Sequence, residues 1–296
     1  MSIKQELEEF IGQRGLTQSA VARGIGVSPA VVSQYLKGVY QGDVPSLERK
    51  LGVWLERERD KVNKGKLQIA FVETSSANWA LSLLQMAHQE GEAVVLYGQA
   101  GLGKTRVLAE YHKRNPDALL LDTDPSYTAK ILVKRLAELV GTATTGSLND
   151  VMDGIIGKLK GSERLIMVDE AELLPLRALE CLRRIHDKTG CGLVLAGMPR
   201  LLINLKGRRG ELVQLYSRIG LAYNMGEQLS ADDLLMIASH TLPNMDTSAL
   251  DELVIQAQGN TRRLHKLMAG VKRMARINRT DANIDMVKQF SELLIK

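Results

Sequence analysis

The chain has 296 residues and a formal net charge of +5 at pH 7. Its length suffices for two or three compact units, and its mild basic excess favours an anionic partner such as nucleic acid. Only Cys181 and Cys191 are cysteines, which excludes a disulfide framework and a cysteine-ligated metal site. The N-terminus does not resemble a signal peptide, and no apolar run reaches membrane-spanning length. We therefore expect a cytoplasmic protein with no membrane partner.

Residues 1–64 are expected to form a helix-turn-helix domain that ends in a polar, basic tether. Thr17 and Ser28 are each suited to cap a helix, and Gly26 supplies the tight turn between the two helices. The pattern looks like the helix-turn-helix of phage repressors, whose second helix lies in the major groove of DNA. The outward residues expected to contact DNA are Ser28, Ser33, Gln34 and Lys37. The alternative is a small helical protein–protein module.

An uninterrupted phosphate-binding pattern, GxxxxGK[ST], occupies residues 98–105 between an expected strand at 92–97 and an expected helix that begins near Arg106. Glycines let successive backbone N–H groups point at phosphate oxygens, and the helix N-terminus adds the positive end of its dipole. Lys104 is expected to reach the β- and γ-phosphates of ATP, and the Thr105 hydroxyl to bind Mg²⁺. The expected nucleotide contacts are Gly98, Gln99, Ala100, Gly101, Leu102, Gly103, Lys104, Thr105 and Arg106.

A second acidic motif follows the apolar strand expected at residues 164–168. Asp169 is predicted to support Mg²⁺, and Glu170 to act as the general base that polarises the attacking water. Many AAA+ ATPases carry a polar sensor residue after the next strand, expected here at 192–197. Met198 occupies that position and cannot donate a hydrogen bond. Either a neighbouring residue substitutes for it, or hydrolysis is slow.

Arg218 lies at the edge of the last strand expected in the core, and a basic loop precedes it. Arg218 occupies the position of an arginine finger, which would act in trans on the γ-phosphate held by a neighbouring subunit; the alternative is a structural or surface arginine. The basic loop before it contains three candidates for contact with DNA, which are equally compatible with a merely solvated surface. These candidates are Lys206, Arg208 and Arg209.

The C-terminal residues 226–296 are expected to be wholly helical. Ser230 begins a variant of a capping box with Asp233. The Gly259-Asn-Thr-Arg262 segment is similar to the second sensor of AAA+ lids, in which Arg262 would contact the γ-phosphate and Arg263 is the fallback. Residues 259–280 carry seven basic residues and no acidic one, which suits either a solvated face or DNA phosphates.

With these parts in order, the full chain resembles the phage Mu transposition protein B family. The resemblance rests on residues 71–74, the phosphate-binding pattern, Val168-Asp-Glu-Ala171, residues 193–197 and Leu215-Tyr-Ser-Arg-Ile219. It implies an α/β fold, with a helix-turn-helix domain at 1–64, an AAA+ ATPase core at 65–225 and a helical lid at 226–296. Met198 is the chief departure, because AAA+ proteins often have Asn there.

The resemblance also implies an activity that no motif displays directly. ATP-bound subunits would assemble as a helical filament around double-stranded DNA with little sequence preference, deliver that DNA to a DDE transposase and stimulate strand transfer. Hydrolysis would be slow by itself, and contact with DNA or transposase would stimulate it and prompt release. The alternatives are a helix-turn-helix transcriptional regulator switched by its ATPase, and a protein similar to a helicase loader.

Overall fold

The structure is a computed structural model that describes residues 3–14, 16–63, 69–206 and 213–294. The chain divides into two compact units, residues 1–68 and residues 69–296. The second unit contains both the expected nucleotide-binding core and the C-terminal helices, so a domain boundary at residue 225 stays a prediction. Within the described ranges, no helix is long and apolar enough to cross a membrane.

The first unit is a helix-turn-helix domain. Its helices are α1 (Ile3–Arg14), α2 (Gln18–Ile25), α3 (Pro29–Lys37) and α4 (Val44–Asn63). Thr17 caps α2 as expected, accepting a hydrogen bond from Ala20 N at 3.2 Å, and Gly26 ends α2 in the left-handed conformation at φ 71°. Ser28 occupies the N-cap of α3, but its side chain makes no capping hydrogen bond. That expectation was wrong; Pro29, with its fixed φ, begins the helix.

An apolar core holds the four helices of the first unit together. Leu51 is fully buried, and the rings of Phe10 and Trp54 meet edge to face with centroids 6.0 Å apart. Tyr35 faces inward from α3, and its hydroxyl donates to Glu48 at 2.7 Å. This anchorage of α3 on α4 fixes which face of α3 stays exposed.

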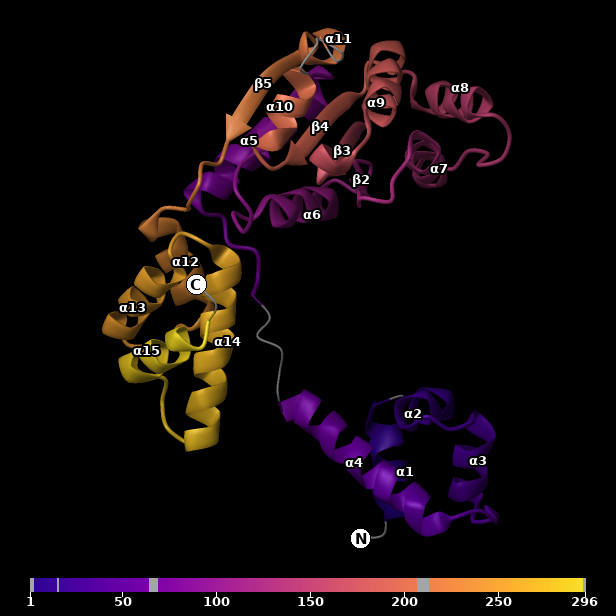
Figure 1. The fold of residues 1–296 in the computed structure, drawn as a ribbon, viewed down its shortest axis with the longest axis vertical. Coiled ribbons are helices and arrows are strands. Elements are labelled where there is room, and N and C mark those ends of the chain that lie inside the picture. The colour runs from indigo at the N-terminus through magenta and orange to yellow at the C-terminus, as the bar shows by residue number, and fades with distance from the viewer. Residues whose placement is uncertain (1–2, 15, 64–68, 207–212, 295–296) are drawn as a thin grey trace. The chain divides into compact units, whose positions relative to one another are not determined.

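The second unit is built on a parallel sheet of five strands (Figure 1). The strands are β1 (Ala93–Tyr97), β2 (Leu119–Asp122), β3 (Leu165–Asp169), β4 (Gly192–Gly197) and β5 (Ile219–Asn224). Their order across the sheet is β2-β3-β4-β1-β5, so β4 lies between β1 and β3. The carboxyl ends of β1, β3 and β4 therefore meet at one edge, where parallel sheets bind ligands.

Helices cover both faces of this sheet, which explains why its central strands are continuous apolar runs. The helices of the core are α5 (Ser75–Glu90), α6 (Lys104–Arg114), α7 (Ala129–Val140), α8 (Leu148–Leu159), α9 (Leu176–Thr189), α10 (Arg200–Lys206) and α11 (Val213–Tyr216), with a short 3₁₀ helix, η1 (Ala171–Leu173). One face carries α5 on β1, β4 and β5, with α6 on β2 and β3. The other face carries α7, α8 and α9, which form a large apolar cluster with alternate strand residues.

The C-terminal helices form a bundle in which α14 is the long member (Figure 1). They are α12 (Ala231–Thr241), α13 (Thr247–Ala257), α14 (Thr261–Asn278) and α15 (Ile284–Glu292). Ser230 caps α12 by accepting from Asp233 N at 3.1 Å. The expected reciprocal bond of a capping box is absent from this described segment. The buried Asp233 carboxylate instead accepts from Ser75 N and Ser76 N, at 3.0 and 3.2 Å, and caps α5.

Candidate nucleotide-binding site

The phosphate-binding loop, residues 98–105, connects β1 to α6 as its motif predicts. Gly101 and Gly103 have φ values of 85° and 95°, which side chains other than glycine rarely adopt. A Cβ at Gly101 would also collide with the Asn260 side chain. Gly103 is the N-cap of α6, so the unpaired N–H groups of the first helical turn face the loop.

Lys104 lies inside the phosphate-binding loop. It is only 9% exposed, and its ammonium donates to the carbonyl oxygens of Gly98 and Gln99 at 2.7 and 2.8 Å. Burial lowers the pKa of Lys104, while the nearby carboxylates of Asp169 and Glu172 oppose that shift. The surrounding backbone carbonyl groups therefore hold the Lys104 ammonium where it can reach an anion bound at the loop.

Asp169 ends β3 beside this loop, and Glu170 follows it directly. Asp169 is 4% exposed, and its Oδ1 accepts from Glu170 N at 2.9 Å. The buried Thr123, which follows β2, donates to the Asp169 carbonyl at 2.7 Å and secures the turn. Burial raises the pKa of Glu170, and the charges of Asp169 and Glu172 raise it further. A carboxyl with a raised pKa is a better proton acceptor than an ordinary glutamate.

These elements enclose a cavity of about 260 Å³, called here the phosphate cavity. Most of the expected nucleotide-binding residues line this cavity, together with Asp169 and Glu170. Five further lining residues were not expected from the sequence to contact the nucleotide. Its lining comprises Ala100, Gly101, Gly103, Lys104, Thr105, Arg106, Asp169, Glu170, Glu172, Gly197, Met198, Arg200, Thr261 and Arg262. Gly98, Gln99 and Leu102 are not in this lining; the first two hold Lys104 instead.

The C-terminal bundle meets the phosphate-binding loop at the start of α14. The Asn260 amide donates to the Ala100 carbonyl at 3.1 Å, and the Thr261 hydroxyl donates to the Gly101 carbonyl at 2.7 Å. The Asn260 oxygen also accepts from Arg262 N at 2.9 Å and so caps α14. These contacts place Arg262 in the wall of the phosphate cavity. Sequence reasoning missed Asn260 and Thr261, although they belong to the same Gly-Asn-Thr-Arg segment.

A second, mainly apolar cavity of about 230 Å³ adjoins the first and shares four of its residues. It is called here the apolar cavity, and its lining comprises Ile69, Ala70, Phe71, Val72, Thr74, Ala77, Leu102, Gly103, Arg106, Val107, Leu229, Ile237, Thr261, Arg262 and His265. Arg106 donates to the Ile69 carbonyl at 2.7 Å and holds the segment before α5 against α6. The apolar cavity suits a nucleobase, whereas the phosphate cavity suits charged groups.

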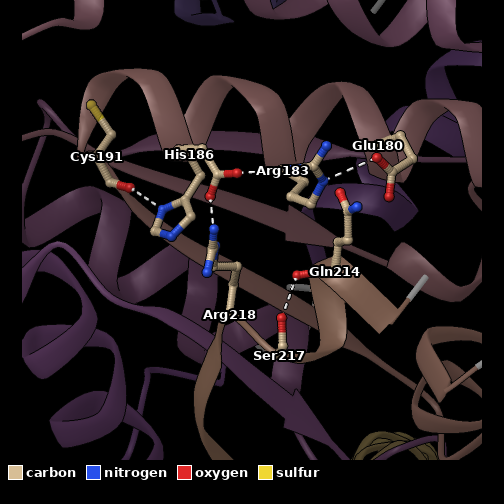
Figure 2. A network of polar contacts seen from close by, with 8 residues as sticks. Glu180, Arg183, His186, Cys191, Gln214, Ser217 and Arg218 are labelled. Atoms are coloured by element: carbon tan, nitrogen blue, oxygen red, sulfur yellow. Dashed lines mark hydrogen bonds and ion pairs between the residues drawn. The ribbon is translucent and has the colours of Figure 1, made fainter.

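Arg218 lies outside both cavities. Figure 2 shows its guanidinium in a polar network on α9, where its Nε donates to Asp187 Oδ1 at 3.0 Å. Asp187 also accepts from Arg183, which in turn donates to Glu180. The residue after Arg218, Ile219, pairs with Ala93 at the start of β1, whereas the phosphate-binding loop follows the end of β1. Arg218 is therefore at the opposite end of the sheet from the phosphates of its own subunit.

The candidate DNA contacts lie elsewhere. On the first unit, Ser28, Gln34 and Lys37 are exposed and Ser33 is half-buried. On the second unit, Lys206 is exposed at the end of α10, with its ammonium 5.7 Å from the centre of the Tyr216 ring. Arg208 and Arg209 lie outside the described residues. Contact with DNA stays a prediction for all of them.

The residues present fit a magnesium nucleotide. The positive-φ glycines open the backbone of the loop, and Lys104 is already positioned among carbonyl oxygens. Thr105 and Asp169 supply hydroxyl and carboxylate oxygens to one cavity, and oxygen ligands are those that Mg²⁺ prefers.

Comparison with known proteins agrees with this description of the fold and of the nucleotide-binding site. A family model described as "AAA domain" matches residues 87–205, and one described as "Helix-turn-helix" matches residues 4–49. The Aeropyrum pernix ORC2 protein, solved with ADPNP and ADP, has a similar fold at a TM-score of 0.62 and 14% identity. The match covers 77% of this chain and 70% of that one.

Sequence relatives extend the match across most of the chain. The ATP-dependent target DNA activator B of Escherichia phage Mu is 26% identical, with coverage of 78% of this chain and 75% of that protein. The Mu-like prophage FluMu DNA transposition protein B of Haemophilus influenzae is 30% identical, with coverage of 78% and 83%. This chain, with its helix-turn-helix unit and its AAA core, belongs to the family of Mu-like DNA transposition protein B.

Proposed function

We propose that this protein is an ATPase that assembles on target DNA in its ATP-bound state, delivers that DNA to a DDE transposase and so stimulates strand transfer. The observation that carries the proposal is the phosphate cavity, whose lining combines Arg262 of the C-terminal bundle with Lys104 and Glu170. It occurs in a chain whose relatives are named DNA transposition protein B and ATP-dependent target DNA activator B.

The cavity residues suit ATP hydrolysis. Lys104 and the N-terminus of α6 bind phosphate oxygens. Glu170 accepts a proton from water while the water oxygen bonds to the γ-phosphorus and the bond to the ADP oxygen breaks. Thr105 and Asp169 would hold Mg²⁺, which neutralises phosphate charge when bound. The position of Arg262 at the start of α14 links the state of the nucleotide to the C-terminal bundle.

The position of Arg218 supports assembly between subunits. Because this residue lies at the far end of the sheet from its own phosphates, it suits the cavity of a neighbouring subunit. Its side chain is 55% exposed, and exposed ion pairs contribute only ~0–1 kcal/mol, so Asp187 can release it at little cost. Because Arg218 would contact the γ-phosphate bound by the next subunit, assembly would depend on ATP.

DNA is gripped through its phosphates in this proposal. The basic candidates are the loop that includes Lys206, Arg208 and Arg209, and the segment 259–280, which contains α14. That segment has seven Lys or Arg residues and no acidic residue. Contacts of this kind do not read bases and weaken steeply with salt. The exposed residues of α3 offer a further contact surface in the first unit.

The experiment that tests this function measures binding of a random-sequence duplex with ATP, with ADP and without nucleotide. The wild-type chain should bind tightly only with ATP and Mg²⁺, and binding should fall as salt rises. Lys104→Ala should abolish the ATP-dependent part, because the substitution removes the phosphate ligand while leaving the basic surfaces intact. Equal binding by both proteins under all three conditions would contradict the proposal.

A further inference from the structure

The segment after β4 lies at the centre of the phosphate cavity. Because β4 lies between β1 and β3, residues that follow it emerge between the phosphate-binding loop and Asp169. Gly197 and Met198 both contribute to the cavity wall. A methionine thioether is at best a weak acceptor and donates nothing, so this central position offers no hydrogen bond to a phosphate oxygen.

Glu172 is a buried acid in the same wall that the hydrolytic motif does not require. Its side chain is 3% exposed, and among the described residues its Oε2 is the buried side-chain oxygen that has no hydrogen-bond partner. A Cβ on Gly197 would collide with this carboxylate, which shows how closely β4 approaches it. A buried carboxylate with an unpaired oxygen is costly unless a cation is near.

Arg200 is the nearby cation. It begins α10, two residues after Met198, and its Nη2 lies 3.7 Å from Glu172 Oε1. That distance is too long for a good hydrogen bond, so charge attraction holds the guanidinium without locking it. The Arg200 side chain is 54% exposed and contributes to the phosphate cavity together with Lys104 and Glu170. The arginine is therefore free to turn toward an anion in that cavity.

We propose that Arg200 is a catalytic residue that binds the terminal phosphate of ATP in place of the missing polar residue at Met198, and that Glu172 is its positioning partner. This inference rests on the proposed ATPase. A guanidinium donates to phosphate oxygens through fixed, charge-assisted hydrogen bonds. Glu172 keeps that group beside the cavity while no phosphate is there, and it balances the positive charge of Lys104 in the cavity wall.

The test compares affinities for ATP and ADP, each with Mg²⁺ and without DNA, by isothermal titration. Arg200→Ala should weaken ATP binding by about 10- to 100-fold and leave ADP binding unchanged, because the lost contact is to the terminal phosphate alone. The control is Arg135→Ala, which removes an arginine of similar exposure that pairs with Glu138 on α7, outside the cavity. It should change neither affinity. Thermal melts establish that both variants are folded.

The double variant Met198→Asn/Arg200→Ala addresses the mechanism. If Arg200 replaces a polar residue after β4, an asparagine there should restore most of the preference for ATP over ADP. Unchanged preference in Arg200→Ala would overturn the inference, and so would an equal loss of ADP binding. Failure of the asparagine to restore the preference would also overturn it. A wild-type protein that binds both nucleotides equally and hydrolyses neither would instead remove the proposed ATPase.

Discussion

Glu170 has a backbone conformation that few residues other than glycine adopt. Its φ is 52°, which costs about 1–3 kcal/mol unless neighbouring contacts compensate. Asp169 accepts from its N–H, and Thr123 donates to its carbonyl at 3.1 Å, so both peptide groups of the turn are paired. The turn sets Glu170 in the wall of the phosphate cavity.

Glu170→Gln should separate nucleotide binding from hydrolysis. An amide of the same shape cannot accept the proton of water, so ATP should still bind while turnover falls by about 10²–10⁴-fold. The DNA-bound state should last longer as a result, which fluorescence of labelled DNA would detect. Glu138→Gln, an exposed change on α7, serves as the control. Rapid release from DNA by Glu170→Gln would remove the assigned role of this residue.

The acid limb of the ATPase pH profile should report the raised pKa of Glu170. Burial is the main cause of the raised value, and the charge of Asp122 contributes. A raised pKa keeps the carboxyl protonated to a higher pH, so activity should be lost on acidification earlier than for an ordinary glutamate. Asp122→Asn removes one cause and should move the limb to lower pH. A limb that stays in place, or moves upward, would contradict this assignment.

At the scale of elements, the C-terminal bundle is fastened to the core at two places. The start of α14 bonds the phosphate-binding loop through Asn260 and Thr261, and Asp233 of α12 caps α5. Both fastenings lie at helix N-termini, where backbone N–H groups need partners. The first touches the loop that would hold phosphates, so movement of the bundle and occupancy of the cavity are expected to be coupled.

Asp233→Ala should destabilise the second unit. It leaves the N–H groups of Ser75 and Ser76 without their buried acceptor, at a cost of about 1–3 kcal/mol. Urea denaturation with a probe of the second unit would measure the loss. Asp246→Ala removes the exposed cap of α13 and should cost less. Equal midpoints for wild type and Asp233→Ala would show that the carboxylate does not fasten the bundle.

Sequence patterns predicted local structure better than long-range contacts. The phosphate-binding loop, the Asp169-Glu170 pair and the Thr17 cap were predictable from the sequence. Each depends on residues that lie within a few positions of one another along the backbone. Arg200 became a candidate only when the strand order placed β4 between β1 and β3. The bond from Asn260 to Ala100 joins residues 160 positions apart, and Asp233 was expected to cap its own helix. No local spacing specifies such contacts.

At the scale of the whole molecule, the two compact units divide the possible DNA-binding roles. Each unit has its own apolar core. A filament-forming protein would bind DNA largely through the second unit, whereas a transcriptional regulator would need the helix-turn-helix unit to recognise an operator. A filament-forming protein and a regulator would both use the phosphate cavity, so the cavity alone does not distinguish the two functions.

Residues 69–296 alone should keep most of the ATP-dependent, sequence-tolerant binding to DNA. The physical reason is that the phosphate cavity, Arg218 and the basic face of α14 all belong to this unit. Gel shifts with several unrelated duplexes would measure it, with the Lys104→Ala form of the same fragment as control. Complete loss of binding, with the fold intact, would favour the regulator.

The central claim is that ATP joins neighbouring subunits around DNA. The most direct test is a cryo-electron microscopy reconstruction of the full chain with a hydrolysis-resistant ATP analogue, Mg²⁺ and long random-sequence DNA. We predict coated duplex, with each nucleotide in the phosphate cavity of one subunit and Arg218 of the next subunit against its γ-phosphate. Isolated particles on bare DNA, or nucleotides remote from any neighbouring subunit, would contradict the account.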